Sequence, residues 1–462
     1  MKIPFSINIL FCMVLVAHGT KKPNIIYILA DDLGYGDLGC YGQAVIQTPH
    51  IDQLRSEGMR FTNHHSGSTV CAPSRVSFLT GKHMGNAYVR GNGSIRLRED
   101  PNDITVARLL KDAGYHTAMI GKAGTGAVVP PGHPNRKGFD YFFGQNRHGA
   151  AHYYFPESAF RNAEKITYPN NKKTSGDTYI HDEYLKEILQ YLEERSGTGQ
   201  PFFLHYGAQI PHAQMHVPEE WVAQYRGKVG ADTPVERGKR KGLSEEPKAT
   251  FAGMVSRFDW EIGEIVSQLK KLGILENTVI MFSSDNGPHG EGGQNPKWFN
   301  SGGGLRGMKR DLFEGGLRVP MIVRWDGHVA PGSETDHLSA FWDILPTLCE
   351  IAQIEAPSDT DGISFLPTLL GDVDSQKQHE YLYWEFHEGV GSRAALTHRW
   401  KAVQRHMNKP KIGQIMLFDI QADPAEQNDL SVAHPEIVEH FVSLFEEAHT
   451  PTESYSWGNV AK

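Results

Sequence analysis

The first residues in this chain that could do chemistry lie in the run Val-Cys-Ala-Pro-Ser-Arg at positions 70–75. Cys71 stands at the start of a predicted helix, and Arg75 follows four residues later. The positive end of the helix dipole and the guanidinium both favour a thiolate at Cys71. Taken alone, however, the run fits a buried, inert cysteine in a loop-to-helix turn better. The rest of the sequence has to decide between these two interpretations.

Oxygen-bearing side chains follow two predicted strands. Asp31 and Asp32 come directly after one long apolar run, and Asp285 and Asn286 come shortly after another. Such runs are typical of strands buried on both faces, and parallel strands deliver ligands at their carboxyl ends. A solvated turn is the alternative for Asp31 and Asp32, but adjacent carboxylates at the end of a buried strand repel each other unless a cation joins them. Three carboxylates and an amide oxygen suit Ca²⁺, or less well Mg²⁺, rather than zinc.

Cationic side chains are predicted at the same edge of the sheet. Lys122 ends the second predicted strand, His212 follows the third, and Lys309 lies in the run Leu-Arg-Gly-Met-Lys. Charge-assisted hydrogen bonds contribute about 1.5–3 kcal/mol each, so these cations and Arg75 can hold a tetrahedral oxyanion against the metal. The pattern therefore predicts metal-assisted hydrolysis of a phosphate or sulfate ester.

The elements that must position these residues alternate along the first three quarters of the chain. Predicted strands lie at 24–30, 115–122, 201–206, 278–282 and 318–325, and predicted helices at 48–54, 105–113 and 251–272. This alternation predicts an α/β fold with a mostly parallel sheet sandwiched by helices. After about residue 355 the pattern changes to short strands at 381–386, 394–403 and 417–420 and a final helix at 435–448. We expect a catalytic domain at 20–355 and a smaller α+β subdomain with a short antiparallel sheet at 356–462.

The N-terminus has the features of a secretory signal peptide, predicted at 1–19. Lys2 precedes a mostly apolar stretch at 3–16, and Ala-His-Gly at 17–19 is a plausible cleavage site. An uncleaved anchor is the alternative, but no second long apolar stretch follows, so stable membrane insertion is not expected. We expect export to the periplasm or the extracellular space.

Net charge and cysteine content argue against two classes of protein, nucleic-acid binders and disulfide scaffolds. The net charge of −8 leaves no basic excess to neutralise a nucleic acid. Removing the signal peptide takes Cys12 away and leaves Cys40, Cys71 and Cys349, which is no disulfide scaffold. The odd number means that at least one cysteine stays unpaired or is chemically altered.

These motifs together resemble the type I, formylglycine-dependent sulfatase family, and within it the exported carbohydrate sulfatases of the arylsulfatase and N-acetylgalactosamine-sulfatase type. Residues 71–75 match the signature C-x-P-S-R, and Leu-Thr-Gly follows at 79–81. The family's other motifs occur in the family's order at 24–34, 284–287, 307–320 and 417–428. The resemblance spans almost the whole mature chain and implies an alkaline-phosphatase-like fold.

The resemblance implies a role for each matching residue. Cys71 is expected to be oxidised to formylglycine by a formylglycine-generating enzyme during export. Its hydrated aldehyde then attacks sulfur with one hydroxyl, and the other hydroxyl expels sulfate by re-forming the aldehyde. The expected metal ligands, for calcium above all, are Asp31, Asp32, Asp285, Asn286 and residue 71. Arg75 orients the diol, Lys122 and Lys309 bind the sulfate oxygens, and His212 protonates the leaving oxygen.

One position departs from the family's pattern. Many members read G-K-W-H-L-G, with a histidine that contacts residue 71, whereas this chain has Gly124 at that place. A histidine-rich stretch follows at 147–152. We expect His152, or less favourably His148, to occupy the vacant place. The alternative is a substrate-facing or surface histidine.

The substrate expected from the resemblance is a sulfated glycan, with galactose or N-acetylgalactosamine sulfate favoured. Glu385, His387 and Arg393 surround an aromatic run and are candidates for sugar binding, as are His148 and the two lysines; a structural strand with solvated ends is the alternative. Two rival functions stay open: a phosphoester hydrolase of the same superfamily and a catalytically silent glycan-binding relative.

Overall fold

A computed structural model describes residues 21–93, 95–125, 131–145, 147–231, 244–457 and 459–460. The predicted signal peptide and Cys12 therefore lie outside the described residues. Among the helices in the described part of the chain, none is long and apolar enough to cross a membrane.

A 10-stranded sheet forms the centre of the larger unit, in the order β11-β2-β10-β9-β1-β8-β4-β5-β6-β7. Five neighbouring strands in its middle run parallel: β9 (Thr278–Ser284), β1 (Asn24–Ala30), β8 (Phe202–Gly207), β4 (His116–Gly121) and β5 (Tyr141–Gly144). Antiparallel pairing is confined to the flanks, where it involves β10 (Met321–Arg324), β2 (Met59–Phe61), β6 (Ser158–Arg161) and β7 (Glu164–Thr167). The edge strand β11 (Ser333–Thr335) pairs with β2 in parallel. The sheet is mostly parallel in its core, as the sequence predicts.

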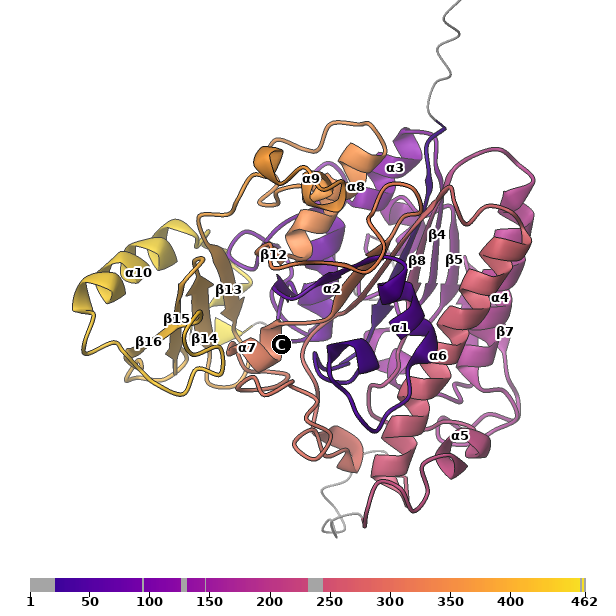
Figure 1. Ribbon diagram of the computed structural model, residues 1–462, viewed down its shortest axis with the longest axis horizontal. Coiled ribbons are helices and arrows are strands. Elements are labelled where there is room, and N and C mark those ends of the chain that lie inside the picture. Colours follow the sequence, from indigo (N-terminus) through magenta and orange to yellow (C-terminus); the bar gives the residue numbers. More distant parts are fainter. Residues whose placement is uncertain are drawn as a thin grey trace, which may run out of the picture.

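Helices cover both faces of this sheet (Figure 1). Side chains of β1 alternate between the faces, so Ile26 and Ile28 join one apolar cluster while Ile25 and Leu29 join the other. The first cluster is closed by α1 (Pro49–Ser56), α4 (Ile180–Ser196) and α6 (Pro247–Lys271). The second is closed by α2 (Cys71–Thr80), α3 (Val106–Asp112) and α8 (Ile344–Ile351). Because β1 is buried on both faces, polar residues can appear only where the strand ends.

The C-terminal unit is a separate 4-stranded antiparallel sheet beside the larger one (Figure 1). Its strands are β13 (Leu382–Phe386), β14 (Ser392–Leu396), β15 (Trp400–Arg405) and β16 (Ile415–Asp419). One face packs against α10 (Pro435–Glu447) through Phe441 and Phe445. Its other face packs against the larger unit around Val70 and Trp342. The small sheet is therefore anchored directly beside the start of α2.

Shorter elements complete the described chain: β3 (His64–His65), β12 (Ser339–Ala340), β17 (Tyr455–Ser456), β18 (Asn459–Val460), α5 (Glu219–Ala223), α7 (Glu314–Leu317), α9 (Leu366–Leu369) and the 3₁₀ helices Gly39–Tyr41, Pro134–Lys137, His148–His152, Glu291–Gly293, Phe341–Asp343 and Val373–Ser375. Leu366 and Leu369 of α9 pack into the apolar cluster of the larger unit. The architecture confirms the predicted fold class, whereas the boundary at residue 355 stays a prediction.

Candidate active site

The carboxyl ends of the central strands bring the predicted oxygen ligands together. Ala30 of β1 is in register with Ser284 of β9, so the residues that follow leave the sheet at the same level. The backbone N–H of Asp32 donates to Asp285 Oδ1 at 3.1 Å. Asp31, Asp32, Asp285 and Asn286 are all fully buried. The strand register thus brings together two pairs of neighbouring residues that lie about 250 positions apart in the sequence.

Asp31 and Asp285 are held by two cations from different elements. Lys122, which follows β4, lies with Nζ 2.5 Å from Asp31 Oδ2. Arg75, on the first turns of α2, donates Nε to Asp285 Oδ2 at 2.8 Å. Burial by itself raises the pKa of Asp31, but the charges of Lys122 and Arg75 outweigh it and hold that pKa below its ordinary range. Burial and the charge of Asp31 raise the pKa of Asp285 well above its ordinary value.

Asp32 is the centre of a second group of contacts. Lys309 Nζ lies 2.6 Å from Asp32 Oδ2 and 3.1 Å from His212 Nε2. Asn286 Nδ2 donates to Asp32 Oδ1 at 2.8 Å. Burial and then the charge of Lys309 lower the pKa of His212 well below its ordinary value, so the imidazole is neutral beside the ammonium. Asp32, Lys309 and His212 thus form one hydrogen-bonded group.

The chemistry of the oxygen set fits a hard divalent cation. Asp31 Oδ1 and Asn286 Oδ1 are buried and accept no hydrogen bond from the described residues. Ligand atoms of Asp31, Cys71 and Asp285 lie within 4.8 Å of one another. Buried acceptors without donors are costly, and a cation among them removes that cost. The residues present therefore suit Ca²⁺ or Mg²⁺, which take oxygen ligands.

Cys71 is the first residue of α2 and is 1% exposed. Burial raises the pKa of its thiol, but the charge of Lys122 and a hydrogen bond with His152 outweigh burial and lower it. Its Sγ also lies 3.8 Å from Asn92 Oδ1. Residue 71 is thus directed into the charged group rather than into an apolar core.

Gly124 lies against the side chain of Arg75. Its φ is +73°, and a Cβ built there would come within 2.4 Å of Arg75 Cδ. A histidine cannot stand at this position while Arg75 keeps its contacts with Asp285 and with the Lys122 carbonyl, which Nη1 reaches at 2.9 Å. The histidine that reaches residue 71 comes instead from the 3₁₀ helix at His148–His152.

Three histidine rings line up beside Lys309. His152 stacks on His212 with centroids 3.9 Å apart, and His289 is stacked 6.1 Å from His212 on its other side. His289 Nε2 lies 3.0 Å from the carbonyl of Pro211. His289 was not among the residues predicted from the sequence, although it lies only three positions after Asn286.

Of the residues predicted to bind sugar, Lys122 and Lys309 lie in this group, whereas Glu385, His387 and Arg393 do not. Glu385 and His387 are fully buried in the C-terminal unit, where Glu385 contacts Arg90 at 3.2 Å and His387 at 2.7 Å. Arg393 pairs with Glu446 at 3.1 Å on the side of α10. The side chain of His148 lies outside the described part of the structure. Substrate binding by these residues therefore stays a prediction.

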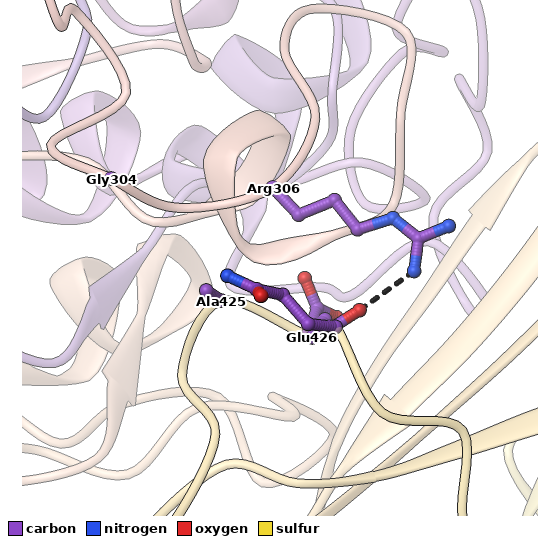
Figure 2. A pocket seen from close by; sticks show the side chains of 5 residues that line it. Gly304, Arg306, Ala425 and Glu426 are labelled. Atoms are coloured by element: carbon purple, nitrogen blue, oxygen red, sulfur yellow. Dashed lines mark hydrogen bonds between the residues drawn. The ribbon is translucent and has the colours of Figure 1, made fainter.

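An open hollow of about 410 Å³ lies at the junction of the two units, beyond the loop that carries Lys309. Figure 2 shows Arg306 reaching across this hollow toward Glu426 of the C-terminal unit. The Nη1 of Arg306 donates to the carbonyl of Glu426 at 2.7 Å. The guanidinium also lies 3.9 Å from the ring centroid of Phe313. Arg306 thus joins the loop of Lys309 to the C-terminal unit.

Comparison with known proteins identifies the family. The sulfatase family model matches residues 23–354, and a model described as N-sulphoglucosamine sulphohydrolase, C-terminal, matches residues 306–449. An N-acetylgalactosamine-6-O-sulfatase of Bacteroides thetaiotaomicron is 30% identical, covering 94% of this chain and 94% of the relative. The N-acetylgalactosamine-6-sulfatase of Rattus norvegicus is 32% identical, covering 77% of this chain and 67% of the relative.

Solved structures agree with this assignment. The protein Ps i-CgsB, crystallised with k-i-k-neocarrahexaose, superposes with a TM-score of 0.76 at 25% identity, covering 92% of each chain. A protein from a study of glycosaminoglycan metabolism by Bacteroides thetaiotaomicron gives a TM-score of 0.76 at 26% identity, covering 93% of this chain and 99% of that one. The chain belongs to the sulfatase family of sulfuric ester hydrolases.

Proposed function

We propose that this protein hydrolyses the sulfate ester of a sulfated glycan, with galactose or N-acetylgalactosamine sulfate as the favoured substrate. The observation that carries this proposal is the position of Cys71. Its sulfur lies within 4.8 Å of carboxylate oxygens of Asp31 and Asp285, and it is hydrogen-bonded to His152. The curated relatives named for N-acetylgalactosamine-6-sulfate support the choice of sugar.

Residue 71 is proposed to act as formylglycine, made from Cys71 by a formylglycine-generating enzyme. The hydrated aldehyde supplies the nucleophilic hydroxyl and a second hydroxyl that later expels sulfate. A calcium ion, held by Asp31, Asp32, Asp285, Asn286 and residue 71, supplies Lewis acidity toward the sulfate when bound. The open acceptors Asp31 Oδ1 and Asn286 Oδ1 support this ligand set.

The protein's own side chains then orient the ester and manage its charge. The charges of Lys122 and Lys309 both act on residue 71, and we assign these two lysines to the sulfate oxygens. Arg75, fixed by Asp285, is assigned to orient the diol at residue 71. We assign His212 to protonate the leaving sugar oxygen, and the Lys309 ammonium, 3.1 Å from His212 Nε2, is placed to supply that proton.

His152 is proposed to take the place that Gly124 leaves vacant. Its hydrogen bond with Cys71 and its stacking on His212 support this role. A His152→Ala enzyme is expected to lose turnover with its formylglycine content unchanged. Full turnover in this variant would remove His152 from the mechanism.

Turnover of matched aryl sulfate and aryl phosphate esters tests the reaction, because a phosphoester hydrolase would prefer the phosphate. Release of sulfate from a panel of defined galactose and N-acetylgalactosamine sulfates then tests the substrate. The mass of the tryptic peptide 61–75 reports the state of residue 71. Active protein with an unmodified cysteine contradicts the mechanism, and modified protein without any sulfatase activity supports the silent glycan-binding relative.

Export to the periplasm or extracellular space is also a proposal. It rests on the N-terminal sequence at 1–19. Cell fractionation of the full-length protein, with the N-terminus of the mature form determined by mass spectrometry, tests it directly.

A further inference from the structure

The start of α2 is capped by a residue far away in the sequence. The N-cap residue Val70 makes no side-chain capping hydrogen bond in the described structure. Instead, the backbone N–H of Ala72 donates to Asn92 Oδ1 at 3.0 Å. The same oxygen lies 3.8 Å from Cys71 Sγ. Asn92 therefore touches both the first turn of the helix and the side chain at position 71, while it is itself exposed at the surface.

The C-terminal unit holds Asn92 in this place. The backbone N–H of Asn92 donates to Glu388 Oε1 at 2.7 Å, just after β13. Two residues earlier, Arg90 contacts Glu385 at 3.2 Å and donates to the carbonyl of Thr450 at 2.8 Å. Glu385 is fixed in turn by His387 at 2.7 Å. The segment 90–92 is thus clamped to the small sheet at both ends.

From these contacts we propose that Asn92 is a positioning residue for the group at position 71 and that Glu388 keeps it in place. The amide oxygen has two lone pairs, so it can accept from Ala72 N–H and from a hydroxyl on residue 71 together. His152 contacts residue 71 as well. Asn92 and His152 then fix the rotation of the hydrated aldehyde between them. The effect on the hydrate rests on the proposed function, but the cap on α2 does not.

The test compares Asn92→Ala, Asn92→Asp and Glu388→Gln with the wild type. Asn102→Ala, an exposed asparagine ten positions further on, is the matched control. Formylglycine content is measured by peptide mass, and rates are expressed per modified enzyme. For Asn92→Ala we expect kcat to fall about tenfold, the size of one hydrogen bond, with KM changed less than about twofold. Glu388→Gln is expected to fall less, and the control not at all.

Two measurements do not depend on turnover. Amide hydrogen exchange at the start of α2, measured on unmodified Cys71 protein, is expected to accelerate in Asn92→Ala and to be protected again in Asn92→Asp, which keeps an acceptor oxygen. Reaction of the modified protein with an aminooxy probe, which forms an oxime and releases water, is expected to be faster in Asn92→Ala because the hydrate loses a hydrogen-bond acceptor.

The outcomes separate this proposal from the proposed function. Wild-type rates of turnover, exchange and oxime formation in Asn92→Ala reject Asn92 as a positioning residue and leave the sulfatase activity intact. A modified wild type that hydrolyses no sulfate ester rejects the function, while exchange still decides the role of Asn92. Should Asn92→Ala fail to fold, a Glu388→Ala variant, which removes the acceptor of the Asn92 N–H, decides through the same three measurements, and wild-type values in it reject the clamp.

Discussion

Two clusters of buried charge, one around Glu314 and one in the active site, are built from similar residues and differ in how their acceptor atoms are arranged. Around Glu314 of α7, both carboxylate oxygens are bound: Lys401 lies 2.8 Å from Oε1, and Arg318 and His65 lie 2.7 Å and 3.1 Å from Oε2. In the active site, Asp31 and Asn286 each keep an oxygen that accepts no hydrogen bond from the described chain. An open acceptor alone does not make a ligand site, because Glu426 Oε1, 3.2 Å from Lys401 in the Glu314 cluster, also accepts no hydrogen bond from the described residues. The active site differs in that ligand atoms of Asp31, Cys71 and Asp285 converge within 4.8 Å of one another.

The largest effect on activity is expected from a substitution of residue 71, which belongs to the active-site cluster and not to the cluster around Glu314. Cys71→Ala removes the precursor of the nucleophile, so turnover of an aryl sulfate is expected to fall by about 10⁴-fold or more. The melting temperature should stay close to that of the wild type, because alanine suits a helix position and the substitution removes a single sulfur atom. Retention of even a tenth of the activity would contradict the assignment of residue 71.

Removing divalent metal should affect the active-site cluster and leave the cluster around Glu314 unchanged. After dialysis against a chelator, activity is expected to fall at least about 100-fold, because the charge of the sulfate is no longer balanced, and the melting temperature is expected to drop by mass action. Added Ca²⁺ should restore both more fully than Mg²⁺. Unchanged activity in protein shown by elemental analysis to be metal-free would rule out the metal site.

A substitution in the cluster around Glu314 should lower stability and leave activity nearly unchanged. Lys401→Met leaves Glu314 with one buried cation fewer, and breaking such a pair costs about 3–5 kcal/mol of unfolding free energy. Denaturant unfolding measures this loss. The activity of the folded fraction is expected to stay within about twofold of the wild type, since residue 401 touches none of the reacting groups. A stable variant with lost activity would show that the two clusters are coupled.

A smaller effect is expected from pH. Burial raises the pKa of Glu314, but Lys401 and Arg318 outweigh burial and hold it well below its ordinary value near 4.5. The unfolded chain therefore takes up the proton first, so the stabilisation is present above pH 4.5 and is lost as the pH falls below it. A Glu314→Gln variant should show a flatter fall in melting temperature between about pH 5 and pH 3. An equally steep fall in both proteins would contradict the prediction.

Much of the fold could be predicted because buried strands leave a clear record in sequence. The apolar runs that became β1, β4, β8 and β9 are continuous, since both faces of each strand are covered. Helix α4 was missed because tyrosines and a histidine interrupt its apolar positions. The buried His181 contacts Glu261 and Tyr154, which are distant in the sequence. Strands β6 and β7 were missed because edge strands carry a half-exposed, polar pattern.

By itself the sequence determined which oxygen-bearing and cationic residues follow the carboxyl ends of the buried strands, and it contained the family motifs. These are local properties, since a polar residue can follow a buried strand only where that strand leaves the core. Only the tertiary structure decided that Glu385 and His387 support a neighbouring segment, that Gly124 makes room for Arg75, and that Asn92 caps α2. These contacts join residues up to hundreds of positions apart, and their geometry depends on how two units pack, which no local pattern records.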